Sequence, residues 1–219
     1  MMQIVPIVIL GAGGDALVVA ETVRACREAG QPLAFAGFLD DRLFGQEIAG
    51  APVLGKLSDW DTLDPGACFV LALHKVKQMH RRKALVDSLG IPADRWMTII
   101  HPSAVVARDA EIGPGAFIAA HVVIQPRAKV GRCATIRAGA NIGHDAICGE
   151  HAYVGPNATL CGKAVLSEGS HLGPNAVIVD GMVVEAFAVI GAGSVATKRV
   201  PSFEVHFGVP ARKVLDIVR

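Results

Sequence analysis

The sequence predicts an α/β, Rossmann-like N-terminal domain followed by an all-β domain folded as a parallel β-helix. Two observations support this. Short apolar strands alternate with amphipathic helical stretches from residue 3 to about residue 95, and a six-residue apolar period then runs without a gap from Ile100 to Ile190. The change of period divides the 219-residue chain into expected domains 1–97 and 98–219.

The first half of the chain is typical of a small parallel sheet with crossover helices. IVPIVIL is expected to form the first strand, GAGGDA a turn, and residues 17–30 a helix. LAFAGFLDD is expected to form a second strand ending in two acids, residues 42–65 a loop-rich segment, and residues 67–73 a third strand. A second helix over residues 76–90 would close at Gly90. This alternation favours a Rossmann-type sheet.

The second half of the chain repeats every six residues. Four places after each apolar position comes a small residue, with Val122 and Met182 as the larger exceptions. This period fits neither an α-helix face nor a hairpin, but it suits a parallel β-helix in which each hexad forms one flat side. Three sides make a coil of 18 residues, so we expect about five coils and no large protruding loop. The sixteen inner positions are Ile100, Val106, Ile112, Ile118, Ile124, Val130, Ile136, Ile142, Cys148, Val154, Leu160, Leu166, Leu172, Ile178, Val184 and Ile190.

Several segments together resemble a known family. The hexads, the closing GVPARKV at residues 208–214, and the N-terminal GAGGDA, GFLDD and GAPVLGKLSDW resemble the hexapeptide-repeat, left-handed β-helix sugar O- and N-acyltransferases of bacteria. These enzymes modify nucleotide-linked amino sugars or sialic acid. The resemblance covers nearly the whole chain and is nearest to the group that acetylates UDP-, dTDP- or GDP-linked 4-amino sugars. It implies a left-handed prism, a homotrimer and acetyl-CoA as the acyl donor.

The resemblance also implies the catalytic pair. In that family a histidine followed by an acid, in a segment like VxHDCxIG, is the general base, and the matching residues are His144 and Asp145. An imidazole can take a proton from an amine or hydroxyl that attacks a thioester, and an adjacent carboxylate raises its basicity. The hexad pattern alone leaves open that His144 is a solvated surface residue. Arg127 and Lys163 share the column of Asp145, so we expect this acid between two cations.

The family binds its donor between neighbouring prisms. By family position Gly162 offers a backbone N–H to the thioester oxygen. Tyr153 stands where related enzymes commonly carry a second histidine that contacts the donor, and we expect Tyr153, with His171 above it, to take over that contact. His151 is expected to be structural or at the surface. The remaining residues expected at the donor are Gly173, Pro174 and Ala192 along the pantetheine arm and Lys198, Arg199, Arg212 and Lys213 at the CoA phosphates.

The N-terminal turn is the expected acceptor site, although a turn without a ligand stays possible. Its glycines offer backbone N–H groups and a helix N-terminus to a diphosphate, and acids at the end of the second strand can hold a ribose or base edge. Three positions depart from the family: Asp15 replaces a histidine, His74-Lys75 replaces a Gly-Asn pair, and Arg137-Ala138 replaces Asn-Thr. Further cations, Lys77, Arg81 and Arg82, could also grip phosphate. The residues expected at the acceptor are Gly11, Gly13, Gly14, Asp15, Asp40, Asp41, His74, Lys75 and Arg137.

Composition narrows the possible partners. The 21 basic residues nearly balance the 20 acidic ones, so no overall field favours nucleic acid or a membrane surface. Every apolar run breaks well short of the ~20 residues that cross a bilayer, and no basic segment precedes the first apolar run, as a signal peptide would require. The five cysteines form no CxxC pair, which favours reduced thiols, a cytoplasmic protein and no metal.

Three other interpretations stay open. A metal-dependent hydratase would need three histidines from His121, His144, His151 and His171, but these fall in four different columns of the coil. A non-catalytic scaffold would not need the His144-Asp145 pair. An acyltransferase with a different small amine or alcohol as its acceptor would explain the departures in the N-terminal half.

Overall fold

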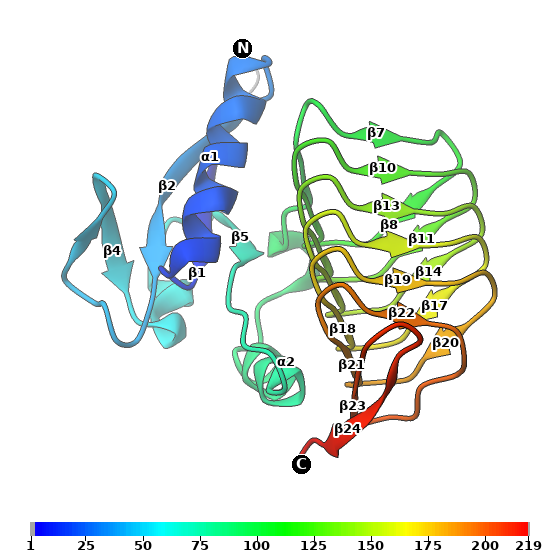
Figure 1. Cartoon of the computed structure of the whole chain (residues 1–219). Helices are drawn as coiled ribbons and strands as arrows, with labels where there is room; N and C mark the ends of the chain where they lie inside the picture. Colours follow the sequence, from blue (N-terminus) through cyan, green and yellow to red (C-terminus); the bar gives the residue numbers. More distant parts are fainter. Residues whose placement is uncertain (1–2, 219) are drawn as a thin grey trace.

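The computed structural model describes residues 3–218, in which a helix-flanked sheet lies beside a prism of stacked coils (Figure 1). The sheet has the order β3-β4-β2-β1-β5. All its neighbouring strands run parallel except the β3–β4 hairpin. Its strands are β1 (Val5–Leu10), β2 (Leu33–Leu39), β3 (Glu47–Ile48), β4 (Ala51–Gly55) and β5 (Cys68–Leu71). The predicted Rossmann-like sheet is confirmed.

Helices α1 (Gly14–Glu28) and α2 (Met79–Ser88) cover opposite faces of this sheet. Side chains alternate along β1, so this strand presents apolar residues to both helices. Ile7 packs in the cluster that holds α1, whereas Val8 packs in the cluster that holds Val86 of α2. Both clusters also include residues of the prism, so the two halves share their cores. Within residues 3–218 no helix is long and apolar enough to cross a membrane.

The expected loop at residues 42–65 is partly wrong, since it contains β3, β4 and the 3-10 helix η1 (Leu57–Thr62). Strand β4 buries Ala51 and Val53 and turns Pro52 outward. Five residues that include a proline and a glycine give too short an alternation to be recognised as a strand. A second short 3-10 helix, η2 (Ala93–Arg95), leads into the prism.

The prism confirms the hexad prediction. Two-residue strands recur every six residues and pair in parallel with the strand 18 residues away, as Ile124 pairs with Ile142. They form three sheets without any interrupting loop. The strands are β6 (Ile99–Ile100), β7 (Val105–Val106), β8 (Glu111–Ile112), β9 (Phe117–Ile118), β10 (Val123–Ile124), β11 (Lys129–Val130), β12 (Thr135–Ile136), β13 (Asn141–Ile142), β14 (Ile147–Cys148), β15 (Tyr153–Val154), β16 (Thr159–Leu160), β17 (Val165–Leu166), β18 (His171–Leu172), β19 (Val177–Ile178), β20 (Val183–Val184), β21 (Val189–Ile190) and β22 (Val195–Ala196).

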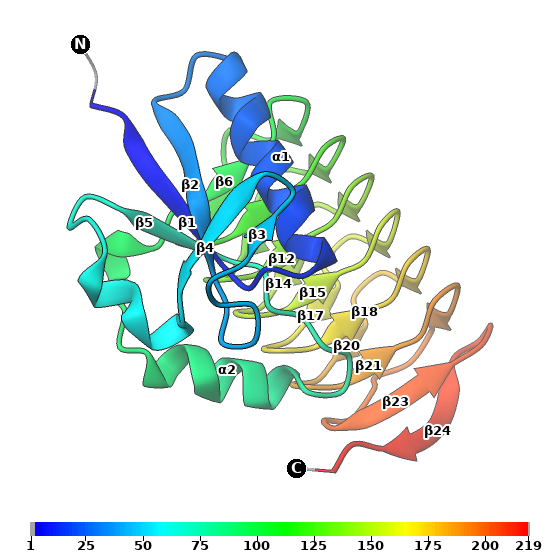
Figure 2. The same cartoon turned by 90° about the vertical axis from the view of Figure 1, so that its left-hand side faces the viewer.

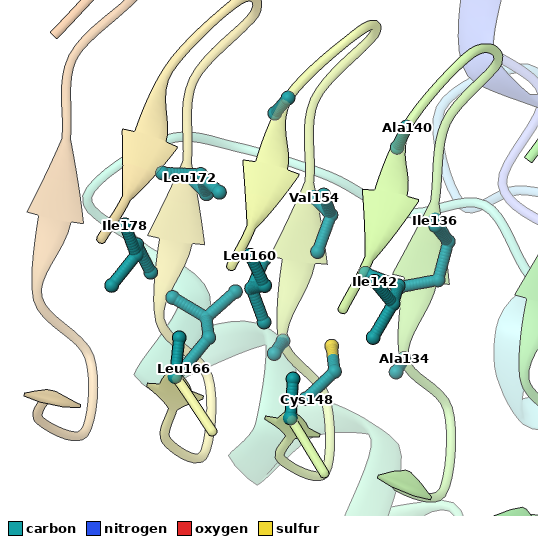
Figure 3. Close-up of a cluster of buried hydrophobic side chains, with 14 of the residues drawn as sticks. Ala134, Ile136, Ala140, Ile142, Cys148, Val154, Leu160, Leu166, Leu172 and Ile178 are labelled. Atoms are coloured by element: carbon teal, nitrogen blue, oxygen red, sulfur yellow. The ribbon is translucent and has the colours of Figure 1, made fainter. Parts of the chain in front are cut away.

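The periodic residues fill the interior of the prism. Ile142, Cys148 and Val154 point inward from three different sheets (Figure 3) and are fully buried. The small residues four places after the inner positions are buried at the corners, as Ala140 and Ala146 show. A hairpin of β23 (Glu204–Phe207) and β24 (Arg212–Asp216) ends the chain, with β23 beside β21.

Three edges run along the prism, each formed by turns that recur every 18 residues. The His144 edge lies between the sheets of β13 and β14, the His151 edge between those of β14 and β15, and the Arg137 edge between those of β12 and β13. In each turn from Gly115 to Gly193 one residue adopts the left-handed backbone conformation, which most side chains avoid. Asp145, at φ +59°, is one of them. Figure 2 shows one row of these turns stacked beside α1.

Candidate functional site

The His144 edge carries the predicted catalytic pair. Nδ1 of His144 lies 2.8 Å from Oδ2 of Asp145. The ionised carboxylate accepts a hydrogen bond from the N–H of this nitrogen, so Nε2 of the neutral ring keeps its lone pair. The side chain of His144 is about half exposed (51%), which leaves Nε2 open to a substrate.

Arg127, one coil below, binds Asp145 with both arms of its guanidinium. Nε lies 2.6 Å from Oδ1, and Nη2 lies 2.8 Å from Oδ2. Hydrogen bonds from Arg127 and then from His144 hold the pKa of the Asp145 carboxyl well below its usual range. The expectation of two cations around Asp145 is half right, because Lys163 makes no ion pair in the described part of the chain.

Gly162 sits directly above the imidazole. A β-carbon at this position would lie 2.6 Å from Nε2 of His144, so only glycine lets the ring rest on this turn. Across residues 3–218 the N–H of Gly162 has no hydrogen-bond acceptor. A free N–H beside the proposed base is the arrangement that an oxyanion hole needs.

The residues predicted for the pantetheine arm lie on a different edge. Gly173 and Pro174 follow β18 and Ala192 follows β21, so all three belong to the Arg137 edge. The sheet of β13 separates them from His144 within one chain. Packing alone also requires a glycine at position 173, since an added β-carbon would lie 2.6 Å from the backbone nitrogen of Ala192.

The predicted phosphate-binding cations come together at the C-terminal end of the prism. Arg199 is bound by Glu185, and Lys213 by Glu204 and Asp216. Lys198 and Arg212 have no carboxylate partner among the described residues, so these two are the better candidates for an anion. A cavity of about 220 Å³ is lined by Lys198, Arg199, Arg212 and Lys213, with Ala196, Val200, His206 and Ala211.

Tyr153 and His171 form a ring stack under the N-terminal domain. Their centroids lie 4.8 Å apart, and His74 covers Tyr153 at 3.8 Å. Burial lowers the pKa of His74 to about 4 and that of His171 to about 3, so both rings are neutral near pH 7. One chain does not bring this stack to His144, and the expected contact of Tyr153 with the donor stays a prediction.

Two of the departures from the family bind each other. Nη1 of Arg137 lies 2.7 Å from Oδ1 of Asp15, which joins the first turn of α1 to the prism. The sequence identified each residue as a departure but not their pairing. Because Arg137 compensates the charge of Asp15, the acid does not leave an uncompensated negative charge at the expected diphosphate site.

The paired acids after β2 bind the backbone of their own domain. Asp40 is buried and accepts from the N–H groups of Ala12, Arg42 and Leu43. Asp41 accepts from Leu57 through one oxygen. These contacts give Asp40 a structural role, because it joins the glycine turn to the loop after β2. Asp41 has fewer hydrogen bonds and is the better candidate to bind a ligand.

A basic cavity of about 300 Å³ opens beside His74 and Lys75. Its lining residues are Arg42, Leu73, His74, Lys75, Gln78, Arg81, Arg82 and Leu85. It contains several cations and no acid, which favours an anionic group such as a phosphate.

Arg82 is one of the cations that could grip phosphate by sequence, but it is buried and its guanidinium is occupied. It donates to the carbonyls of Leu73, His151 and Cys133 at 2.6, 3.1 and 3.3 Å. His151 is fully buried, as its predicted structural role allows, and burial together with Arg82 lowers its pKa to about 4. This contact could not be predicted from the sequence because it depends on how the domains dock.

The four histidines of the hydratase interpretation do not meet. His121 lies on the Arg137 edge, His144 and His151 on their own edges, and His171 in a strand. Among residues 3–218, no three histidine, cysteine, aspartate or glutamate side chains gather as a metal site.

Fold and site define a two-domain protein in which a Rossmann-like sheet is joined to a hexapeptide-repeat β-helix. The PglD N-terminal domain family matches residues 6–87, and the GMPPB C-terminal domain family matches residues 96–200. UDP-N-acetylbacillosamine N-acetyltransferase of Bacillus subtilis (strain 168) is 32% identical over 118 residues, which are 52% of this chain and 51% of that protein. The chain thus matches about half the length of this relative.

Solved structures match over nearly the whole chain. PerB from Caulobacter crescentus, in complex with CoA and GDP-perosamine, is 30% identical with a TM-score of 0.81, covering 95% of this chain and 97% of its own. The acetyltransferase domain of PglB from Neisseria gonorrhoeae, in complex with acetyl coenzyme A, is 27% identical with a TM-score of 0.83, covering 97% and 100%. The protein therefore belongs to the family of hexapeptide-repeat sugar acetyltransferases.

Proposed function

We propose that the protein transfers the acetyl group of acetyl-CoA directly to the amino group of a nucleotide-linked sugar, with His144 as the general base. The observation that carries this proposal is the free Nε2 of His144 beside the free N–H of Gly162. Asp145 fixes the tautomer, Nε2 takes the proton of the attacking amine, and Gly162 stabilises the developing oxyanion. No covalent acyl-enzyme is needed.

We infer that acetyl-CoA lies along the His144 edge, with its phosphates near Lys198 and Arg212. The free cations of the C-terminal cavity support this placement. PerB and the PglB domain, which match this chain throughout, bind CoA and acetyl coenzyme A in their solved complexes.

The pantetheine arm is assigned to a second chain. Gly173, Pro174 and Ala192 lie on the Arg137 edge, and they meet the His144 edge only if neighbouring prisms pack edge to edge. The sheet between these edges exposes apolar side chains, among them Val105 (63%) and Val123 (37%). A homotrimer with a donor site between each pair of prisms accounts for both features.

The acceptor is assigned to residues 1–97, and residues 98–219 carry acyl transfer. Gly11, Gly13 and Gly14 open α1 and offer backbone N–H groups to a diphosphate. Asp41 can hold the nucleoside, whereas the basic cavity at Lys75 offers a second site for phosphate. We place the enzyme in the cytoplasm, which agrees with its free cysteines.

A panel of acceptors tests this function. The protein is mixed with acetyl-CoA and UDP-, dTDP- and GDP-linked 4-amino sugars, and thiol release is followed. Turnover on one of them supports the proposal. Turnover only on amines without a nucleotide would instead support a different small acceptor, and thiol release from none of the nucleotide sugars would refute the proposal.

A further inference from the structure

Asp180 lies on the His144 edge, in the turn two coils above His144. Its Oδ1 would lie 3.0 Å from a β-carbon at Gly162, the same point that Nε2 of His144 approaches at 2.6 Å. The carboxylate and the imidazole therefore converge on Gly162 from opposite sides. The sequence does not distinguish Asp180, because its turn looks like any other in the repeat.

The two acids near the imidazole differ in their charge balance. Asp145 is held by both arms of Arg127, so much of its charge is compensated. Asp180 is exposed and has no ion pair or hydrogen bond within residues 3–218. Its charge reaches the neighbouring Cys161, where burial first and Asp180 second raise the pKa of the thiol. An uncompensated carboxylate beside a lone pair creates a negative potential that attracts a cation.

We propose that Asp180 binds the ammonium form of the acceptor beside Nε2 of His144 and makes this site selective for amines over hydroxyl groups. The inference rests on the proposed function and deepens it by naming the residue that recognises the reacting group. A sugar amine is protonated near neutral pH, and a carboxylate gains more from an ammonium than from a neutral hydroxyl. The basic groups on this edge above His144 are Lys163, Lys198 and Arg199. None of them ion-pairs with Asp180 in the described chain, and Arg199 is bound by Glu185.

The proton balance fits this assignment. The bound ammonium gives one proton to Nε2 of His144, and the freed nitrogen lone pair attacks the thioester carbon. The C–N bond forms, the C–S bond breaks, and the CoA thiolate takes the proton from His144. The second proton lost by the nitrogen goes to water. Each turnover thus yields one amide, one thiol and one released proton.

Asp180→Asn tests the inference because asparagine keeps the shape and removes the charge. The acceptors are two nucleotide sugars that differ only in an amino or a hydroxyl group at the acylated carbon. Asp180→Glu restores the charge, and Glu150→Gln removes an exposed acid from the His151 edge as a matched control. Steady-state constants are measured for both acceptors and for acetyl-CoA.

For Asp180→Asn we expect kcat/KM with the amine to fall at least about 10-fold, mainly through the KM of the acceptor. The KM of acetyl-CoA and the rate with the hydroxyl acceptor should stay unchanged, and Asp180→Glu should recover part of the loss. A rise in the KM of acetyl-CoA alone would assign Asp180 to the donor and overturn the inference, as would an unchanged preference for the amine. A wild type that turns over neither acceptor would instead refute the proposed function itself.

Discussion

Arg137 and Asp15 lie 122 residues apart in the sequence and are joined by a hydrogen-bonded ion pair of 2.7 Å between the prism and the first turn of α1. Only 12% of the Arg137 side chain is exposed, so its charge depends on this partner more than a surface charge would. The pair places the glycine turn of the N-terminal domain at a fixed point on the prism.

The first prediction concerns this pair. Asp15→Asn and Arg137→Gln should each lower the free energy of unfolding, and a double-mutant cycle should give a coupling of about 1 kcal/mol or more. Urea denaturation of the four proteins measures it. Additive effects of the two substitutions would show that the contact contributes nothing to docking.

Among single residues, Arg82 should contribute most to holding the two domains together. Arg82→Met leaves the carbonyls of Leu73, Cys133 and His151 without their donor, so we expect a loss of about 2 to 4 kcal/mol in urea denaturation. Arg81→Met changes the neighbouring exposed arginine of the same helix and should cost less than about 0.5 kcal/mol. Equal effects of the two variants would contradict the assigned role of Arg82.

Stability should fall in mild acid. The folded-state pKa values of His74 and His151 (about 4) and His171 (about 3) lie below the value of about 6.5 that a histidine has in an unfolded chain. The unfolded chain therefore binds more protons, and stability is full above pH 6.5 and declines as the pH falls toward 4. At pH 5 each of these histidines should lower the free energy of unfolding by about 1 to 2 kcal/mol relative to neutral pH.

Urea denaturation at pH 8, 6.5 and 5 follows this decline. His171→Phe keeps an aromatic ring in the stack without a titrating group, so its stability should depend less on pH than that of the wild type. His121→Phe, at an exposed turn, serves as the control and should leave the dependence unchanged. A flat profile for the wild type between pH 6.5 and 5 would contradict the burial of neutral histidines.

Gly162→Ala should damage the site and spare the fold. The added β-carbon meets the ends of the His144 and Asp180 side chains, which can move away, and not a rigid backbone. We expect thiol release from acetyl-CoA to fall about 100-fold while the melting temperature changes by only a few degrees. Undiminished acyl transfer by this variant would show that the ring does not need to rest on Gly162.

The interior of the prism could be predicted from the sequence because its contacts repeat with the chain. Ile142 meets residues one coil away, and the same spacing places them throughout the repeat. The environment of the outward-facing positions was harder to predict. His151 occupies an outward position and is nevertheless fully buried, since docking of the N-terminal domain covers that edge. A period describes one domain and carries no information about the surface that another domain covers.

In the candidate site too, contacts between sequence neighbours could be predicted and contacts between distant segments could not. His144 and Asp145 are neighbours in sequence, so their contact could be expected. The ion pair of Asp15 with Arg137 depends on packing between distant segments, and the approach of Asp180 to Gly162 depends on side-chain direction within the turn. Neither leaves a mark in a single sequence.

The most direct test of the central claim is the rate of thiol release from acetyl-CoA with a nucleotide-linked 4-amino sugar, compared between wild type and His144→Ala. If His144 is the general base, kcat should fall about 100-fold or more in the variant. His121→Ala, a histidine on another edge, should retain the wild-type rate. A His144→Ala protein that keeps its fold and transfers acetyl groups at the wild-type rate would contradict the account.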